Sequence, residues 1–549
     1  MSPLVSEPEE EPPPAAVLAA AISALSALVA GDVTVNLNET VADDKCIVNG
    51  NVFGCNNLMG TPSGKVTVHI YKTWSDAGWT DPNDLDDIDD TKHKYHLKAV
   101  YGGGNLAAYE PKNATSTDPT VKASAFAHVI IDGCDRTSIR TVYGGGNAAS
   151  TPAARVDVNG TYEIEELFGG GNGKDDLPDG SANPGANVGF KNYSAVENEY
   201  DTREKRQQEF FVNNYTYGSG QAEVNMYGGL VHRIYGGSNT KGNVRIVAVT
   251  MLDEQSGCAF NVEQAYGGGK SAPMDGRAEL KMACVPGLKV AYGGAEEADI
   301  QNDVILNLTN GNFDRVFGGN NVNGTIHGKI TVNIEETGCH LISIGQLYGG
   351  GNQAPYIGPL ENGTRVGPTI NVKSFSSIGE IYGGGYGKTA VVTGDTHVNI
   401  NVCKGKDFGD SEEAEAARVN QHTGEQTISF SQFKRNDDPS TGYFVLDEDG
   451  HRVVEDKTET VTLPEFVPGK IGAITNIYGG GNEAEVVGNT YVNIGTESTV
   501  DFETGVGSAE PLHGVAVDGV DIRGNVYGGG NQANVTGKTN VTIGHQTTP

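Results

Sequence analysis

The sequence predicts an all-β protein, an elongated single-stranded β-solenoid (parallel β-helix) made of coils of about 25 residues with inserted loops. Three observations predict this fold. An aromatic–glycine–asparagine unit recurs along the chain, an alternating β-branched segment follows several copies, and neighbouring copies are evenly spaced. Because so short a unit cannot bury its apolar face alone, its copies are stable only when each covers the next.

The first half of the unit is an aliphatic residue, then Tyr or Phe, then glycines that are usually closed by Asn. Strand alternation turns the aliphatic residue inward and the ring to the opposite face. Rings at equivalent positions in stacked coils would form a ladder, and the preference for Tyr favours an edge that is wet or hydrogen-bonded. Gly and Asn suit a left-handed corner, and Asn can also form an amide ladder. The thirteen pairs are Val52-Phe53, Val100-Tyr101, Val142-Tyr143, Leu167-Phe168, Met226-Tyr227, Ile234-Tyr235, Ala265-Tyr266, Ala291-Tyr292, Val316-Phe317, Leu347-Tyr348, Ile381-Tyr382, Ile477-Tyr478 and Val526-Tyr527.

The second half of the unit reads Gly-x-Thr-x-Val-x-Ile, most clearly at 394–400, 488–494 and 537–543. Alternating β-branched residues have the period of a strand. Each copy therefore holds at least two short strands separated by a Gly/Asn corner.

Spacing sets the length of one coil and the domain boundaries. Tyr143 and Phe168 are 25 residues apart, and Tyr266 and Tyr292 are 26 apart, while the widest gap contains a segment rich in Glu, Asp and Lys. The expected organisation is an acidic, Pro-rich leader with an Ala-rich capping helix at 1–30, a solenoid at 31–402, a charged insertion at 403–470 and a continued solenoid at 471–549.

Two interpretations of the segment at 1–30 are open. Residues 15–30 are Ala-rich and periodic, which indicates a short N-terminal capping helix, but a degenerate or replaced signal region is the alternative, since Glu and Pro precede it where a signal carries Lys or Arg. No apolar run reaches the roughly 18 residues of a membrane span. The last repeat ends near the end of the chain, so we expect a part of a longer protein. A homo-oligomer and a monomer both stay open.

The net charge and the cysteine pattern limit the binding partners, metal sites and disulfides that we expect. The net charge of −32 would repel nucleic acid and anionic lipid and attract divalent cations. The seven cysteines form no C-x-x-C pair and no zinc pattern, so we expect buried thiols, with Cys46 and Cys55 as the one plausible local bridge.

Two acidic loops make calcium the one cofactor that the sequence leaves open, since dense carboxylates suit hard cations. Neither loop matches an EF-hand, and a solvated acidic loop is the competing interpretation. The candidate ligands are Asp84, Asp86, Asp87, Asp89, Asp175, Asp176 and Asp179.

The tyrosines of the repeat are the candidate ligand-binding residues, because exposed rings in a row would form a platform for sugars or for an apolar partner surface. Interior stacking that only stabilises the fold is the alternative. No serine, histidine or carboxylate pattern marks a catalytic residue. The candidates are Tyr101, Tyr143, Tyr348, Tyr382, Tyr478 and Tyr527.

The repeat resembles the Gly/Asn-rich repeats of large bacterial surface and secreted proteins with an adhesin-like β-helix architecture, over nearly the whole chain from residue 31. The resemblance implies an extracellular or cell-surface location. Together with the acidic surface and the lack of catalytic signatures, it favours a non-enzymatic adhesin or stalk that binds a glycan or a protein on a host or partner cell. The alternative is a β-helix enzyme that degrades polysaccharide or a phage-spike-like glycan cleaver.

Overall fold

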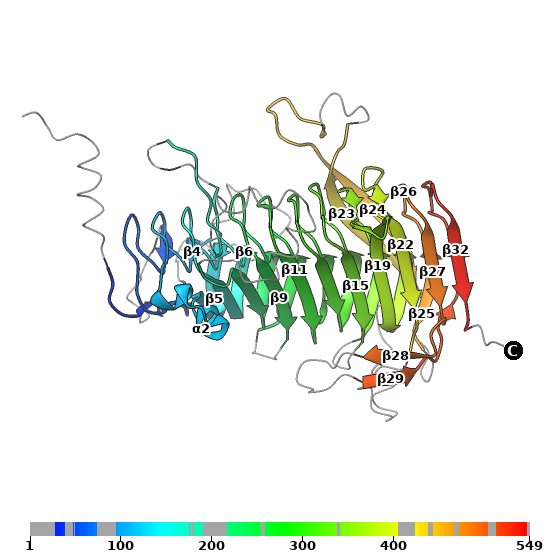
Figure 1. The fold of residues 1–549 in the computed structure, drawn as a ribbon, viewed down its shortest axis with the longest axis horizontal. Helices are drawn as coiled ribbons and strands as arrows, with labels where there is room; N and C mark the ends of the chain where they lie inside the picture. The colour runs from blue at the N-terminus through cyan, green and yellow to red at the C-terminus, as the bar shows by residue number, and fades with distance from the viewer. Residues whose placement is uncertain are drawn as a thin grey trace, which may run out of the picture.

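The computed structural model of the chain describes residues 28–38, 48, 50–73, 95–174, 177, 180–189, 217–253, 258–336, 341–403, 423–436, 443–465, 471–502 and 512–545. These residues are almost entirely in β-strands, which confirms the all-β prediction. The only helical segments among them are η1 (Lys112–Thr115) and α2 (Pro119–Ala123). A sheet of 25 strands, all of them paired in parallel except β18, runs along the long axis of an elongated molecule, with the strands lying across that axis (Figure 1).

Strands of this sheet pair mainly with the strand two positions along the chain, so two rows of parallel strands interleave. The first, which we call the ring row, carries the aromatic half of each repeat, and its residues pair without a shift, as Tyr348 does with Tyr382. The ring row consists of β2 (Asn51–Phe53), β4 (Leu97–Tyr101), the second parts of β5 (Ala127–Tyr143) and β6 (Ala154–Phe168), β8 (Gly229–Tyr235), β10 (Phe260–Tyr266), β12 (Gly287–Tyr292), β14 (Gly311–Phe317), β16 (Ile342–Tyr348), β20 (Ser377–Tyr382), β25 (Ala473–Tyr478), β30 (Asp521–Ile522) and β31 (Val526–Tyr527).

The second row carries the alternating β-branched half of the repeat. Its burial alternates along most of the strands, as the period of two requires, for example in β13 and β27. It consists of β1 (Val33–Leu37), β3 (Val66–Ile70), the first parts of β5 and β6, β7 (Gln221–Met226), β9 (Ile246–Leu252), β11 (Arg277–Ala283), β13 (Val304–Leu308), β15 (Ile330–Glu335), β19 (Thr364–Ser374), β22 (Asp395–Ile400), β27 (Thr490–Ile494) and β32 (Thr539–Ile543).

A third row of parallel contacts is much shorter. It contains β17 (Tyr356–Ile357), β21 (Val392–Thr393) and β26 (Val486–Val487), and single bridges such as Ile300 to Ile326 continue it. The remaining strands are antiparallel: β18 (Leu360–Glu361) pairs with β19, β23 (Gly424–Phe433) with β24 (Val454–Leu463), and β28 (Thr499–Phe502) with β29 (Leu512–Ala516).

The core lies between the rows and follows the predicted inward positions. Val142, Ile234, Leu347 and Ile381, each the residue before a ring, are completely buried and belong to one continuous apolar cluster. On the opposite side of the same strands, twelve aromatic rings form a second cluster that we call the ring ladder. Successive rings stack with centroids 4.6 to 5.1 Å apart, from Phe53 to Tyr527.

One predicted ring is not in the ladder. Tyr227 directly follows β7, and Met226 before it pairs with Val158 and Met251 in the second row. The expected Met226-Tyr227 copy was therefore wrong. Its Gly-Gly sequence resembles the repeat, but the true ring of this part of the chain is Tyr235.

The corner glycines serve close packing rather than the left-handed backbone that we expected. Gly102 and Gly144, each directly after a ring, have no positive φ, and no corner Asn of the described residues has one. A Cβ on Gly102 would lie 2.3 Å from the carbonyl oxygen of Gly144, and a Cβ on Gly144 would lie 2.4 Å from that of Gly169. Successive corners are too close for any side chain there.

Cysteine pairing also differs from expectation. Cys134 and Cys258, which are 124 residues apart, form a disulfide, and Cys284 is disulfide-bonded as well. Cys55, half of the local bridge that we expected, is a free thiol. Only Cys403 among the described cysteines is the buried free thiol that the sequence favoured.

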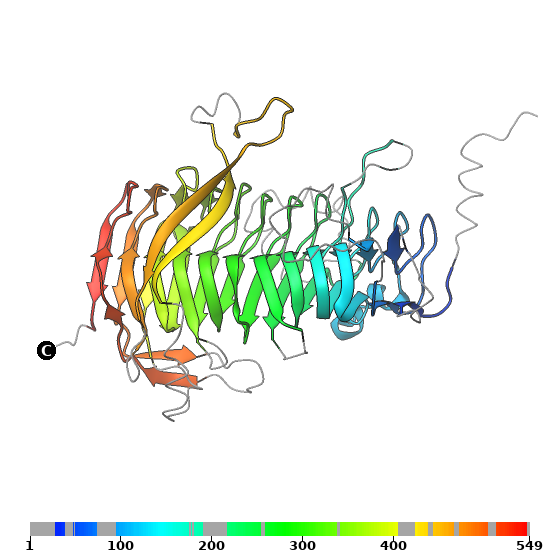
Figure 2. The same ribbon diagram turned by 180° about the vertical axis from the view of Figure 1, so that it is seen from behind.

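Two predicted segments are described only in part. Of the expected capping helix, only the last residues lie inside the described ranges, and there Val29 forms a parallel bridge with Pro62. Within the expected insertion, β23 and β24 form an antiparallel hairpin that lies obliquely across the outer side of the ring row (Figure 2).

Candidate functional site

The six tyrosines predicted to bind a ligand all lie in the ring ladder, and five of them are buried. Each of these five stacks against a ring on both sides, so no ring face remains open to a sugar. Burial raises the pKa of the Tyr382 hydroxyl, as expected for a phenol held away from water. The buried five are Tyr101, Tyr143, Tyr348, Tyr382 and Tyr478. Only Tyr527, at the C-terminal end of the ladder, is 43% exposed.

A row of side-chain amides runs beside the rings, as the Asn at the end of the unit predicted. Asn147 donates to Asn105 over 2.8 Å and accepts from Asn172 over 2.8 Å. The row also binds ring hydroxyls: the Nδ2 of Asn239 lies 3.3 Å from the hydroxyl of Tyr143. A partner in this row favours Tyr over Phe at such positions, whereas the hydroxyl of Tyr348 has no partner among the described residues.

The amide row is interrupted where Lys270 and Glu296 take the Asn position, and a charged cluster replaces it. Lys270 Nζ lies 2.6 Å from a carboxylate oxygen of Glu166, and the hydroxyl of Tyr235 donates to Glu296. Arg233 adds a contact of 3.3 Å to Glu166. These partners satisfy one another within the cluster, so it resembles an internal ion-pair network more than an open site.

His232 links this cluster to the neighbouring repeats. Its Nε2 lies 3.4 Å from Glu163, and its Nδ1 lies 3.2 Å from Glu263. Burial disfavours the imidazolium, but the hydrogen bonds and charges of the two glutamates outweigh it and raise the pKa of His232 to about 9. The ring is therefore a fixed positive charge at neutral pH.

Hairpin β23–β24 packs closely on the ring row because two positions of that row are glycine. The column three residues before each ring carries a long side chain in most repeats, for example Lys289, but Gly345 and Gly379 occupy it in β16 and β20. A Cβ on Gly345 would lie 2.8 Å from Ile428 of the hairpin, and one on Gly379 would lie 2.4 Å from Val461. The hairpin packs directly against the backbone there.

The hairpin is held to the ring row by polar contacts as well. The hydroxyl of Tyr386 donates to Glu459 of β24, and Gln346 Nε2 donates to the same carboxylate over 2.9 Å. Beyond the strands, Arg452 forms an ion pair of 2.6 Å with Glu297 in a corner of the stack. The hairpin is thus pinned at both ends.

One edge of the hairpin and the ring row enclose a cavity of about 220 Å³, which we call the hairpin groove. Its wall combines amides, charged groups and aromatic rings from both sides. The lining residues are Glu263, Gln264, Lys289, Val290, Tyr292, Asp314, Arg315, Asn321, Asn352, Ile428, Ser429, Phe430 and Ser431.

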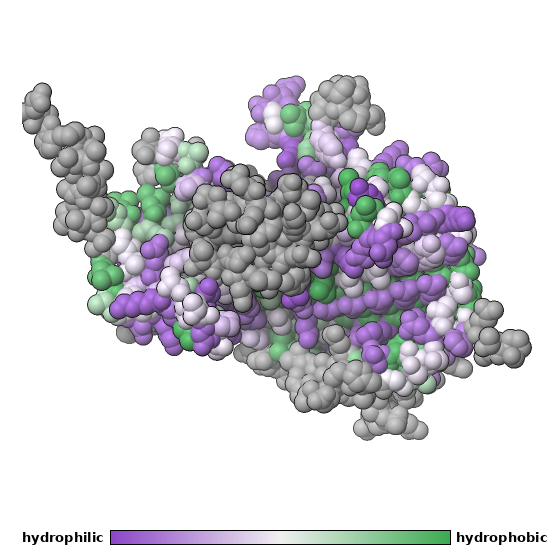
Figure 3. All heavy atoms as spheres, in the orientation of Figure 1, coloured by the Kyte–Doolittle hydropathy of each residue, from purple (hydrophilic) through white to green (hydrophobic). Residues whose placement is uncertain are grey.

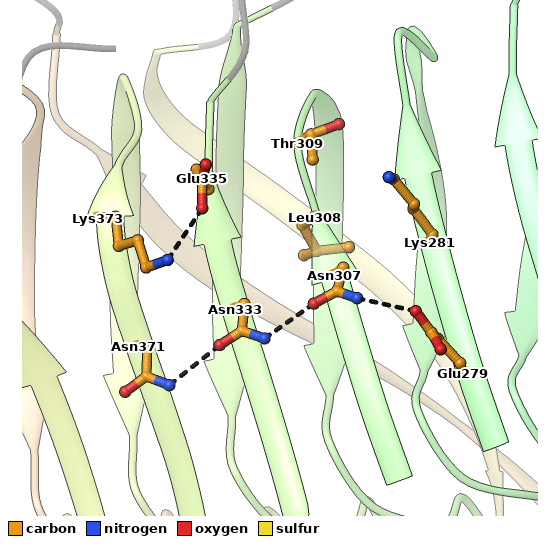
Figure 4. A pocket seen from close by; sticks show the side chains of 9 residues that line it. All are labelled: Glu279, Lys281, Asn307, Leu308, Thr309, Asn333, Glu335, Asn371 and Lys373. Carbon is orange, nitrogen blue, oxygen red and sulfur yellow. Dashed lines mark hydrogen bonds and ion pairs between the residues drawn. The ribbon is translucent and has the colours of Figure 1, made fainter. Parts of the chain in front are cut away.

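A second cavity, of about 190 Å³, lies on the outer side of the second row (Figure 4). Its floor is another amide row, in which Asn333 donates to Asn307 over 2.8 Å and Asn371 donates to Asn333 over 3.0 Å. Lys373 forms an ion pair of 3.1 Å with Glu335 at its rim. Hydrophilic residues cover much of the visible described surface near this face (Figure 3). It has no aromatic residue in its wall, unlike the hairpin groove.

All seven candidate calcium ligands, Asp84, Asp86, Asp87, Asp89, Asp175, Asp176 and Asp179, lie outside the described residues. Within the described ranges, no group of three or more metal-ligating side chains gathers. Calcium binding therefore stays a prediction.

Sequence reasoning missed the hairpin groove, although it singled out 403–470 as an insertion. The two ring-row glycines and the arginine that line or flank the groove fall in regular repeats, and their departure from the repeat is visible only when the strands are aligned in register. An alignment of the repeats in register, rather than any motif, is the signal that could have identified the two glycines and the arginine.

The chain matches no protein-family model, no curated protein and no solved structure. No described helix is of a length and apolarity that could cross a membrane.

Proposed function

We propose that the chain is a non-enzymatic extracellular β-solenoid, an adhesin or stalk, that binds a glycan in the hairpin groove. The solenoid rests on the order in which the chain visits the rows. It passes from the second row to the ring row, then through a glycine corner to the third row, and back to the second row, as in β11, β12, Ile300 and β13. One such cycle is one coil.

An extracellular location is supported by the disulfides. Disulfides persist in oxidising compartments and are rare in the cytosol. Cys134 lies in β5 and Cys258 lies two residues before β10, and their bridge would be reduced inside a cell. The acidic surface suits a long soluble rod outside the cell.

The hairpin groove carries the proposal of glycan binding, because its wall has what a sugar needs. Amides of Gln264 and Asn321 can bond hydroxyl groups, while the ring of Phe430 offers apolar surface to the C–H face of a pyranose. At about 220 Å³ the groove is smaller than the roughly 300–1,000 Å³ sites of drug-sized ligands, so it suits one sugar unit of a longer chain.

The test is binding to a glycan array, followed by titration of each hit with a blocked variant. Ser429 is exposed and lines the groove, and Ser429→Trp should fill it and abolish binding. Thr427 lies two residues earlier on the same side of β23, is also exposed and does not line the groove. Thr427→Trp is therefore the matched control and should bind normally. Hits that bind both variants equally would place the glycan elsewhere, and an array without hits would refute the proposal.

Polysaccharide cleavage is the second candidate function, and one observation favours it. Glu263 and Asp314 both line the groove, and the register places each beside Lys289, so they lie two strands apart. At about 4.8 Å per strand, their backbones are roughly 10 Å apart, near the separation of about 6.5–9.5 Å in inverting glycosidases. Release of reducing ends by the wild type, lost in Asp314→Asn, would replace the binding proposal with this one.

A further inference from the structure

Arg315 is a buried positive charge in the wall of the hairpin groove, and no described carboxylate forms an ion pair with it. The side chain is 1% exposed. Its one hydrogen bond runs from Nη2 to Asn352 Oδ1 at 3.5 Å, which is long for a bond from a charged donor. Its Nε has no partner within the described part of the chain.

Aromatic rings cover the faces of the guanidinium but leave its edge, where the N–H donors lie, uncovered. The Cζ of Arg315 lies 3.9 Å from the centre of the Phe430 ring, 4.2 Å from that of Tyr386 and 4.7 Å from that of Phe317. Cation–π contacts stabilise a charge from above and below. They do not satisfy N–H donors, which lie in the plane of the group.

A guanidinium keeps its proton in proteins, so Arg315 cannot escape burial by becoming neutral. Burying an unpaired charge is costly, and the usual solution is a carboxylate on the edge of the fork. Other charged groups of the groove already form ion pairs: Glu263 lies 3.2 Å from His232 and 3.5 Å from Lys289. Phe430, which covers Arg315, belongs to the hairpin, so the enclosure exists only with the hairpin seated.

We propose that the hairpin groove recognises a carboxylate-bearing sugar, such as a uronic acid, with its carboxylate on the edge of Arg315. This inference rests on the proposed function and adds the chemical class of the ligand. The amides of Asn321 and Gln264 then bond the sugar hydroxyls, and Arg315 distinguishes an acidic sugar from its neutral counterpart. Recognition is local, since the −32 charge of the chain repels a polyanion at long range.

The decisive variant supplies the missing carboxylate from the protein itself. Asn352→Asp places a carboxylate where Oδ1 now lies, 3.5 Å from Arg315, and leaves the arginine and the hairpin in place. Asn147→Asp is the matched control: it breaks the same kind of amide row, where Asn147 donates to Asn105, and the position that corresponds to Arg315, one strand earlier, is Ala99.

The experiment measures the affinity of the whole chain for short oligogalacturonates and for their methyl esters. We expect the wild type to prefer the acid by about tenfold to a hundredfold, the range for loss of a charge-assisted hydrogen bond. Asn352→Asp and Arg315→Gln should bind acid and ester alike, and Asn147→Asp should keep the preference. Circular dichroism and melting of each variant check that the fold is intact, and Asn352→Asp, which retains the arginine, decides the matter if Arg315→Gln loses the hairpin.

Each outcome has a distinct meaning. Equal binding of acid and ester by the wild type, blocked by Ser429→Trp, would overturn the acidic-sugar inference and keep the proposed function. An acid preference that survives in Asn352→Asp would also overturn the inference, because Arg315 would not be its source. Failure to bind either probe, together with an array without hits, would overturn the proposed function itself.

Discussion

Phe168 offers a direct test of how much the ring ladder contributes to stability. Its ring is completely buried and stacks on Tyr143 at 5.0 Å and on Tyr235 at 4.8 Å, with interplanar angles of 11° and 7°. It carries no hydroxyl, so its removal breaks no hydrogen bond. Phe168→Ala therefore removes only burial and two stacked contacts.

The expected loss follows from these facts. Truncating a fully buried Phe to Ala costs about 3–5 kcal/mol, and each stacked pair adds roughly 0.5–1.5 kcal/mol beyond burial. The corners around the ring are tied together by hydrogen bonds such as Gly144 N to the carbonyl oxygen of Phe168, so the cavity cannot collapse easily. We expect the free energy of unfolding to fall by about 4–8 kcal/mol. Tyr527→Ala, which removes a half-exposed ring with one described stacking neighbour, should cost about 1–2 kcal/mol.

Urea-induced unfolding measured by circular dichroism, with native-state hydrogen exchange to locate the loss, compares the two variants. In a repeat stack the damage at Phe168 should raise exchange in β6 and its neighbours first. If Phe168→Ala costs no more than Tyr527→Ala, the ladder does not stabilise the stack and this reasoning fails.

Three further predictions test other parts of the structure. Gly379→Ala should displace the hairpin, because the new Cβ would lie 2.4 Å from the side chain of Val461. Limited proteolysis should then cut the hairpin. Gly529→Ala, where a Cβ has open space, is the control and should resist the protease as the wild type does. The pKa of His232 is raised from its usual value of about 6.5 to about 9 in the folded chain, so its stabilisation is fully present below pH 6.5 and is lost as the pH rises through 9. The stabilisation amounts to at most about 3 kcal/mol, and in a pH titration of stability the wild type should show this loss and His232→Gln should not. The double variant Cys134→Ser/Cys258→Ser should lower stability by about 2–5 kcal/mol and lower the melting temperature, and reductant should then shift its melting temperature less than that of the wild type, because only the bridge of Cys284 is left among the described residues.

The all-β class, the ring positions and the inward aliphatic residues could be predicted because each depends on local alternation and on copies in register. Leu347 and Tyr348 lie on opposite sides of one strand for the same reason in every repeat. The role of the corner glycines could not be predicted, because the clash of Gly102 lies with a carbonyl 42 residues further along the chain, at Gly144. Whether a ring is an open platform or an interior contact likewise depends on the corner that covers it.

The groove and the disulfide escaped prediction for a related reason. Cys134 and Cys258 meet only because the loops between them fold so as to bring repeats together, and their separation of 124 residues carries no spacing signal. Arg315 is one polar residue on a strand of ordinary composition. It becomes unusual only when Phe430, from an insertion more than a hundred residues later, lies on it.

The repeat and its exceptions have different physical roles. Parallel strands in register place equal positions side by side about 4.8 Å apart, so one kind of residue repeated along a column makes a continuous surface. The column three residues before the rings bears Glu263, Lys289 and Asp314 and then changes to Gly345 and Gly379. That change removes two side chains where an inserted hairpin must reach the backbone, and the last charged positions before it become the wall of the groove. The insertion and the two glycines are therefore coupled although they are far apart in the sequence, because Ile428 and Val461 can approach the ring row this closely only where the column carries no side chain.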